Sequence, residues 1–167
     1  MGVEDHRATS PPSVRCFTLT ISDSRTAETD TSGRAIAEML GAAGHQLLGH
    51  AIVRDDPSAV RRVLYEQIGG GHAQVIITTG GTGITSRDST YEAISGILEK
   101  RLDGFGELFR MISYEQIGAA AMLSRACAGT ARGRAIFALP GSEAAVRLAM
   151  TKLILPELGH IVRELSR

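Results

Sequence analysis

The glycine-rich segment 78–83, TTGGTG, carries the strongest chemical signal in this sequence. Its three glycines follow a short apolar run, so backbone N–H groups there can approach an anion without an intervening side chain. The pattern predicts a phosphate-binding loop, and the alternative is a tight turn between a strand and a helix. It is neither a Walker P-loop nor a G-x-G-x-x-G motif, because residue 87 is Arg and residue 86 is Ser. The residues expected to bind phosphate are Thr79, Gly80, Gly81, Thr82 and Gly83.

Asp88 stands just beyond this loop. Ser89 and Glu92 have the spacing of a capping box, so the helix that follows can begin without Asp88 as its cap. A carboxylate beside phosphates repels them unless a cation lies between, and Mg²⁺ prefers one or two carboxylates together with phosphate oxygens. Asp88 is therefore predicted to hold Mg²⁺, and a structural capping role is the alternative.

Two adjacent carboxylates, Asp55 and Asp56, follow another predicted strand. Asp56 precedes Pro57 and is explained as the N-cap of a helix that has proline at its first position. Asp55 then has no obvious structural role. From the residues alone, its functional and structural interpretations remain equally open.

Further polar residues lie in loops whose role the apolar periodicity does not explain. The hydroxyl- and aspartate-rich segment 22–33 could hold a phosphate or a polar ring, or could serve only for helix capping and an Asx-turn. Arg125 could clamp a phosphate, although a surface position is the alternative. Ser142 suits a helix N-cap and does not lie in a G-x-S-x-G elbow, and no other nucleophile stands out. Phosphoryl or nucleotidyl transfer fits this inventory, because it needs positioning and charge neutralisation more than a protein nucleophile.

The apolar pattern predicts how these loops are positioned. Strands are expected at 15–21, 46–53, 74–79 and 135–139, with helices between them and an antiparallel excursion within 123–139. This alternation predicts an α/β fold with three α/β/α layers and a mostly parallel central sheet. The loops at 22–33, 80–88 and 140–142 should then meet at one edge of the sheet. Residues 1–13 are predicted to be a flexible tail, and residues 14–167 a single domain.

The composition restricts the possible partners. Eighteen basic and eighteen acidic residues balance, which gives no overall attraction to nucleic acid or to an anionic membrane. The five histidines have no zinc-ligand spacing. Cys16 and Cys127 are expected to be free thiols, although one disulfide stays open. No apolar run is long enough to cross a bilayer and no signal peptide is visible, so the expected location is the cytoplasm.

Taken together and in order, these motifs resemble the MoaB/Mog family of molybdenum cofactor biosynthesis proteins. The resemblance runs from about residue 15 to about residue 160 and looks closer to MoaB than to MogA. Any single motif is weak, but the ordered set is specific. It consists of Ser22-Asp23, Asp30-Thr31-Ser32-Gly33, the glycine loop with Arg87-Asp88 and Glu92-Ala93, Gly104-Phe105-Gly106-Glu107, Ser124-Arg125, and Leu139-Pro140-Gly141-Ser142.

The resemblance implies a molybdopterin-binding domain that forms homotrimers, or hexamers made of two trimers. It implies a molybdopterin adenylyltransferase, which transfers an adenylyl group from Mg²⁺-bound ATP to the terminal phosphate of molybdopterin for later use by a molybdate-insertion protein. The alternative within the family is a non-catalytic pterin-binding scaffold. By position, Asp55 and Asp88 match the catalytic, magnesium-binding aspartates, and Pro140, Gly141 and Ser142 match the nucleotide side. The expected pterin-pocket residues are Ser22, Asp23, Asp30, Ser32, Gly33, Glu107, Ser124 and Arg125.

Overall fold

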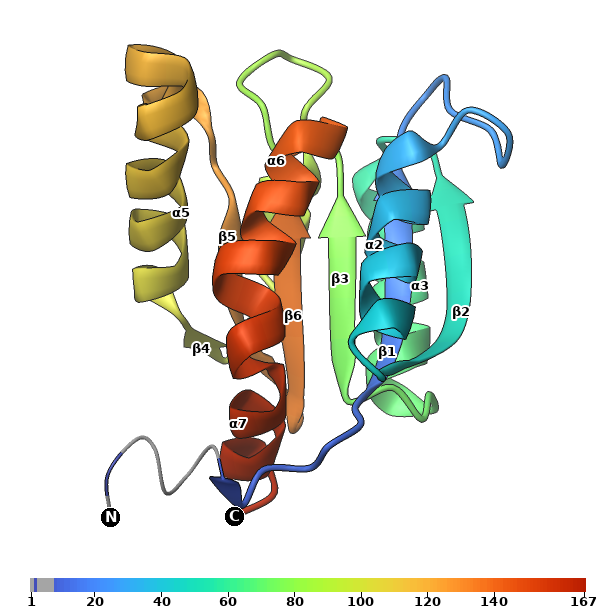
Figure 1. Ribbon diagram of the computed structural model, residues 1–167. Coiled ribbons are helices and arrows are strands. Elements are labelled where there is room, and N and C mark those ends of the chain that lie inside the picture. The colour runs from blue at the N-terminus through green and yellow to red at the C-terminus, as the bar shows by residue number, and fades with distance from the viewer. Residues whose placement is uncertain (1, 3–7) are drawn as a thin grey trace.

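A six-stranded sheet with helices on both faces forms the body of the molecule (Figure 1), as seen in a computed structural model that describes residue 2 and residues 8–167. The strand order is β2-β1-β3-β6-β5-β4. The strands are β1 (Arg15–Ile21), β2 (Gln46–Val53), β3 (Val75–Thr79), β4 (Lys100–Arg101), β5 (Cys127–Ala131) and β6 (Arg134–Leu139). The helices are α2 (Thr31–Ala42), α3 (Pro57–Gly69), α4 (Thr90–Ser95), α5 (Asp103–Ile117), α6 (Glu143–Ala149) and α7 (Leu155–Leu165).

The predicted fold class is confirmed. Strands β2, β1, β3 and β6 run parallel, while β5 pairs antiparallel with both β6 and β4. This is the expected antiparallel excursion, and the short edge strand β4 is an addition that the sequence pattern did not indicate. A two-residue turn at Arg132 and Gly133 joins β5 to β6, and both residues have positive φ, as a type I′ hairpin requires.

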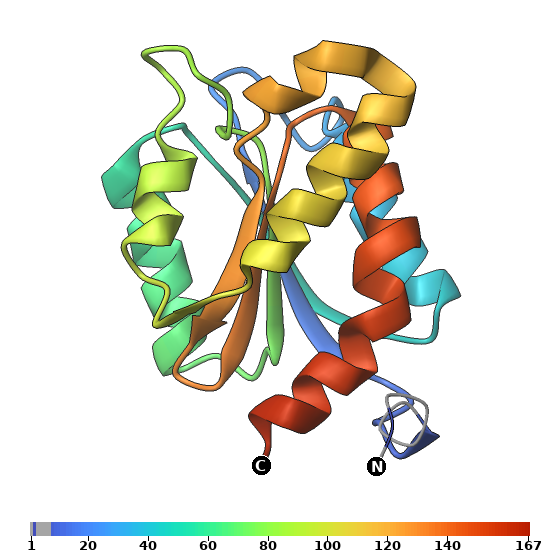
Figure 2. The ribbon, with the colours of Figure 1, turned by 90° about the vertical axis from the view of Figure 1, so that its left-hand side faces the viewer.

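Helices cover both faces of the sheet (Figure 2), and an apolar core lies on each face. One packs α2, α5, α6 and α7 against the sheet, and the other packs α3 and α4. Strand β3 is buried on both faces, so Ile77 joins the first core and its neighbour Ile76 the second. Such continuous apolar strands are typical of a parallel sheet that helices cover on both sides.

The sequence predicts the starts of two helices correctly, but it favours one helix interruption that the structure does not have. Asp56 caps α3 by accepting a hydrogen bond from the Ala59 amide at 2.8 Å, and Ser142 caps α6 in the same way. Because proline interrupts helices, the sequence favours a break in the helical pattern before Pro156, but the structure has none. A π-helical turn, Met150–Ile154, links α6 to α7 without a loop, and Pro156 lies in the first turn of α7, just after it.

Part of the predicted tail contacts the domain. Residues 1 and 3–7 lie outside the described residues, so the structure describes only residues 2 and 8–13 of this tail. A Cβ atom added at Gly159 of α7 would lie 2.9 Å from the Pro11 carbonyl oxygen. The chain before β1 therefore passes close to α7, and Gly159 permits that approach.

Both cysteines are free and buried, which decides between the two alternatives left open by the sequence. Burial raises the pKa of Cys16 to about 12 and that of Cys127 to about 11. Because the thiolate is the reactive form, both side chains should react slowly with a thiol reagent at pH 8 in the folded protein. In denaturant, both should react at the rate of an ordinary cysteine. Rapid labelling of either residue in the native state would contradict this burial.

Candidate active site

A cavity of about 530 Å³ opens where the parallel strands end, between the loops that follow β1, β3 and β6. This is where ligands bind in open α/β sheets, and the predicted convergence of the three loops is confirmed. Most residues singled out from the sequence line this cavity. They are Ser22, Asp23, Ser32, Asp55, Thr79, Gly80, Gly81, Thr82, Gly83, Asp88, Ser124, Pro140 and Gly141.

The glycine loop begins with two residues in conformations that favour glycine. Gly80 has φ +100° and Gly81 has φ +67°. A Cβ atom at Gly80 would lie 2.1 Å from the Ile21 carbonyl oxygen, and one at Gly81 would lie 1.9 Å from Thr90 Oγ1. The Gly80 amide donates to Leu139 at 3.0 Å and is used within the fold. In residues 8–167, the amides of Gly81 and Thr82 donate to no protein group, so these two remain for an anion.

Asp88 faces this loop, at the position that the phosphate hypothesis requires. Its Oδ2 atom accepts hydrogen bonds from the Thr85 amide at 2.9 Å and from the Thr85 hydroxyl at 2.5 Å. The hydrogen bond from the Thr85 hydroxyl is the main cause of a pKa of Asp88 below its ordinary value, so the carboxylate is ionised at neutral pH. A Cβ atom at Gly83 would lie 2.8 Å from Oδ2, which shows how closely the carboxylate approaches the loop.

Asp55 reaches the same loop from the end of β2. Its Oδ1 atom accepts hydrogen bonds from the Ser89 hydroxyl at 2.9 Å and the Ser89 amide at 3.3 Å. Its Oδ2 atom lies 3.0 Å from the position that a Cβ atom of Gly81 would take. The predicted capping box is therefore wrong, because Ser89 makes no side-chain cap and orients Asp55 instead.

The two carboxylates fit a divalent cation that is shared with a ligand. Asp55 Oδ2 has no hydrogen-bond partner among the described residues, and both hydrogen bonds that Thr85 donates to Asp88 go to Oδ2 and not to Oδ1. In the same part of the chain, no three His, Cys, Asp or Glu side chains gather as a complete metal site. A cation at this position would need oxygens from a bound phosphate and from water, which is the coordination that Mg²⁺ prefers.

Arg125 supports the glycine loop and does not line the cavity. Its Nε atom donates to the Gly83 carbonyl at 2.9 Å, and its guanidinium pairs with Glu92 and stacks over the Tyr91 ring. Because Glu92 pairs with Arg125, it does not take its predicted place in the capping box. The suggested phosphate clamp is not what this geometry provides, since Arg125 contacts a carbonyl of the loop itself.

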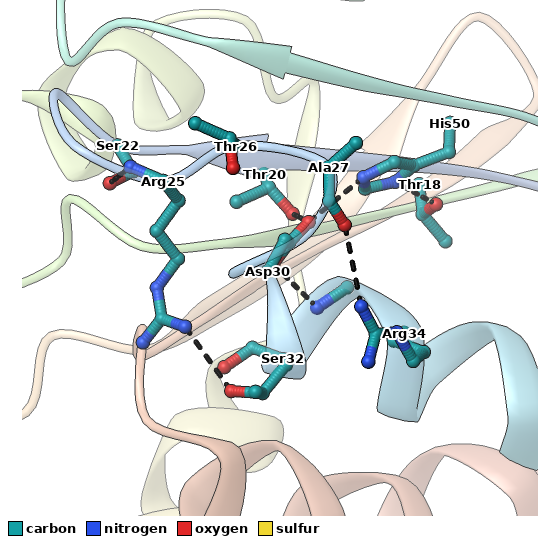
Figure 3. A network of polar contacts seen from close by, with 12 residues as sticks. Thr18, Thr20, Ser22, Arg25, Thr26, Ala27, Asp30, Ser32, Arg34 and His50 are labelled. Atoms are coloured by element: carbon teal, nitrogen blue, oxygen red, sulfur yellow. Dashed lines mark hydrogen bonds and ion pairs between the residues drawn. The ribbon is translucent and has the colours of Figure 1, made fainter.

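Asp30 is a buried structural residue that forms a network of polar contacts just before α2 (Figure 3). It accepts hydrogen bonds from the Thr20 hydroxyl at 2.7 Å, His50 Nε2 at 2.9 Å and the Gly33 amide at 2.9 Å. Because a carboxylate only accepts, His50 Nε2 carries the proton of the Asp30 contact, and His50 Nδ1 forms a second hydrogen bond with the Thr18 hydroxyl at 2.7 Å. The capping interpretation therefore describes Asp30 better than a pocket role.

Replacing Asp30 by Ala should lower the free energy of unfolding by about 2–4 kcal/mol, because several buried donors lose their acceptor. Asp56→Ala is the matched control. That exposed cap accepts one hydrogen bond, so its loss should cost only about 1 kcal/mol. Urea denaturation of both variants measures the difference. Equal losses would show that the buried network adds nothing to ordinary capping.

Three other predicted site residues also lie off the cavity. Gly33 packs against Asp30, and a Cβ atom there would lie 2.3 Å from Asp30 Oδ2. Ser142 caps α6, and Glu107 is exposed on α5, where it lines a separate polar pocket with Arg110. Together with Asp30 and Arg125, these residues were predicted for the site because they sit within its motifs, but they do not face the cavity.

Comparison with known proteins places this site in a family. Residues 17–160 match the family described as "Probable molybdopterin binding domain". Molybdenum cofactor biosynthesis protein B of Bacillus cereus is 52% identical over 168 residues, covering 100% of this chain and 99% of that protein. The chain belongs to the MoaB/Mog family. The resemblance identified from the ordered motifs is thereby confirmed.

Solved structures agree with this MoaB/Mog assignment. A crystal structure of a molybdenum cofactor biosynthesis protein B has a TM-score of 0.92 at 53% identity, covering 95% of this chain and 99% of that one. A structure of MogA has a TM-score of 0.82 at 28% identity, covering 90% and 99%. The higher similarity of the first supports the closer relation to MoaB.

Three further residues at this cavity were not predicted as site residues from the sequence. Arg25 and Leu123 line it, and Ser89 orients Asp55 from just outside it. Arg25 stands two residues after Asp23 in the same polar loop, so a scan of this loop for cationic side chains would have found it. Ser89 was missed because a serine before a helix is explained by capping, and no local pattern reveals a bond across 34 residues.

Proposed function

We propose that this protein acts in molybdenum cofactor biosynthesis as a molybdopterin adenylyltransferase. One observation carries the proposal. Two partly exposed carboxylates, Asp55 and Asp88, border a glycine loop whose Gly81 and Thr82 amides have no protein acceptor among the described residues. Within the MoaB/Mog family, a Mg²⁺-dependent reaction between phosphates uses these groups fully, whereas pterin binding alone needs no paired carboxylates.

In this reaction, a terminal phosphate oxygen of molybdopterin attacks the α-phosphorus of ATP. The bond from that phosphorus to the bridging oxygen of the β-phosphate breaks, and pyrophosphate leaves with the electron pair. The Gly81 and Thr82 amides would hold phosphate oxygens, while Asp55 and Asp88 would bind Mg²⁺, which supplies charge neutralisation. No protein nucleophile is needed, and the described residues that line the cavity include no cysteine, lysine or histidine.

The test is a pyrophosphate-release assay with purified protein, ATP, Mg²⁺ and molybdopterin. We expect pyrophosphate and adenylylated molybdopterin only when all components are present, and none after chelation of Mg²⁺ with EDTA. Binding of both substrates without pyrophosphate release would indicate a non-catalytic scaffold. Pyrophosphate release or ATP hydrolysis independent of molybdopterin would indicate a different acceptor. Either result would overturn the proposed reaction.

The proposal extends to assembly and location. The helix α5 and the short 3₁₀-helix η1 (Gly118–Leu123) carry exposed apolar side chains, among them Leu108, Met111, Ile117 and Met122. Such a stripe suits contact with further copies, so a homotrimer, or a hexamer of two trimers, should appear by light scattering. No helix in residues 8–167 is long and apolar enough to span a membrane. We place the protein in the cytoplasm, where a molybdate-insertion protein would receive the product.

Replacing Ser89 by Ala should slow adenylyl transfer by about 10-fold, because Asp55 loses the hydroxyl that orients it. The folded state should change little, since Ser89 provides no side-chain cap for α4. The turnover number and the melting temperature measure the two effects separately. Ser58→Ala, an exposed serine in α3, is the matched control. Wild-type turnover in Ser89→Ala would remove Ser89 from the mechanism.

A further inference from the structure

The loop between β1 and α2 brings a cation to the cavity. Arg25 is the only Lys, Arg or His side chain among the described residues that line it. The other charged side chains at the cavity are Asp23, Asp55 and Asp88. Arg25 therefore differs in charge from every other ionisable residue at the site, and the reaction described above gives it no role.

Hydrogen bonds donated by one side of the guanidinium group hold the Arg25 side chain in position. Its Nη1 atom donates to the Thr29 carbonyl at 2.8 Å and to the Thr31 hydroxyl at 3.2 Å. The side chain thereby extends from the loop toward the first turn of α2, close to Ser32 (Figure 3). An arginine held in this way loses little conformational entropy when it binds a ligand.

The other side of the guanidinium is available. Among the described residues, Nε and Nη2 of Arg25 donate to no protein atom, and no carboxylate forms an ion pair with it. Arg87 provides the contrast, because its guanidinium is paired at 2.5 Å with Asp23, which lines the cavity. Arg25 thus combines an unneutralised charge with two adjacent donors at the cavity where the Gly81 and Thr82 amides also have no acceptor among the described residues.

A charge count explains why the cavity needs this cation. The two positive charges of Mg²⁺ would be balanced by Asp55 and Asp88, which leaves the phosphates of both substrates without full compensation. A second positive group away from the aspartates would offset the remaining phosphate charge.

We propose that Arg25 binds a substrate phosphate through Nε and Nη2, in the two-pronged geometry that arginine forms with oxyanions. This inference rests on the proposed function, since it assigns one of the substrate phosphates to this loop. The phosphate belongs either to the nucleotide or to the pterin, which share this chemistry. Separate binding measurements distinguish the two sources.

The experiment compares Arg25→Ala, Arg25→Lys and Arg34→Ala by isothermal titration with Mg²⁺-ATP and, separately, with molybdopterin. Arg34 is the matched control, because it donates to the Ala27 and Glu28 carbonyls of the same loop but does not line the cavity. For Arg25→Ala, we expect affinity for one of the two ligands to fall about 10- to 100-fold. Arg25→Lys should recover part of the loss, and Arg34→Ala should bind both ligands as the wild type does.

Two outcomes would overturn the inference. Wild-type affinity of Arg25→Ala for both ligands would show that the guanidinium does not contact phosphate. An equal loss in Arg34→Ala would show that only loop structure is at stake. Neither outcome affects the adenylyl transfer reaction, which the pyrophosphate assay tests in the wild type. Conversely, phosphate binding through Arg25 without pyrophosphate release would overturn only the reaction.

Discussion

Replacing Asp88 by Asn is expected to reduce adenylyl transfer by about 10²- to 10⁴-fold, which corresponds to about 3–5 kcal/mol of transition-state stabilisation. The amide keeps the size of the side chain but removes the negative charge that would hold Mg²⁺ beside the glycine loop. The Thr85 amide can still donate to the Asn side-chain oxygen, so the local turn should persist. The initial rate of pyrophosphate release at saturating Mg²⁺-ATP and molybdopterin measures the effect.

Asp103→Asn serves as the control for this substitution. Asp103 is an exposed carboxylate that pairs with Arg101 at 3.1 Å and lies outside the cavity, so its loss should leave the rate unchanged. Circular dichroism and the melting temperature would show that both variants are folded. Turnover of Asp88→Asn at the wild-type rate would exclude Asp88 from cation binding.

Replacing Gly80 by Ala should lower the free energy of unfolding by about 3 kcal/mol and should abolish ligand binding. The residue has φ +100°, which an alanine adopts only with strain. The added Cβ atom would also meet the Ile21 carbonyl oxygen at 2.1 Å, and a strand carbonyl cannot move aside as a flexible side chain can. Relief of the clash must shift the glycine loop away from β1. Urea denaturation and titration with Mg²⁺-ATP measure the two effects.

Gly41→Ala provides the comparison for this prediction. Gly41 lies within α2, and a Cβ atom there would have no atom within 4 Å. Alanine should stabilise this helix by about 0.5–1 kcal/mol, because glycine loses more backbone entropy on folding. Equal stability of Gly80→Ala and the wild type would show that the loop does not need glycine at this position.

The architecture followed from the sequence because its local signals agreed with the tertiary structure. The segments 15–21 and 46–53 were predicted as strands and form β1 and β2 with those bounds. Each of these apolar, β-branched segments is followed by a polar loop, and the parallel pairing of the strands brings the loops together at one edge of the sheet. Asp56 was also predicted correctly as a cap, since its partner lies only three residues away.

The sequence was less informative where a side chain has a distant partner. Ser89 and Glu92 have capping-box spacing, but Asp55 and Arg125 engage them instead. Both partners lie more than 30 residues away, so the local pattern contains no sign of the competition. Pro156 was misjudged for a related reason. The π-helical turn before it is stabilised within a long packed helix, which a short window of sequence does not reveal.

The same limit affects the site. The sequence identified most of the residues that line the cavity, because glycines and acids follow the buried strands directly. It could not show which polar side chains in those loops turn inward. Asp30 turns into the core to meet Thr20 and His50, and Arg25 lines the cavity. Both belong to one polar loop, where alternation and composition do not specify direction.

The central claim is that Asp55, Asp88 and the glycine loop bind one phosphate-bound cation between them. A crystal grown with Mn²⁺ and a non-hydrolysable ATP analogue tests this most directly, because Mn²⁺ scatters anomalously and can replace Mg²⁺ in oxygen sites. We expect one anomalous peak about 2.1 Å from a carboxylate oxygen of both Asp55 and Asp88 and from a phosphate oxygen, with phosphate at the Gly81 and Thr82 amides. Phosphates bound away from this loop, or a metal ion that does not contact both aspartates, would contradict the account.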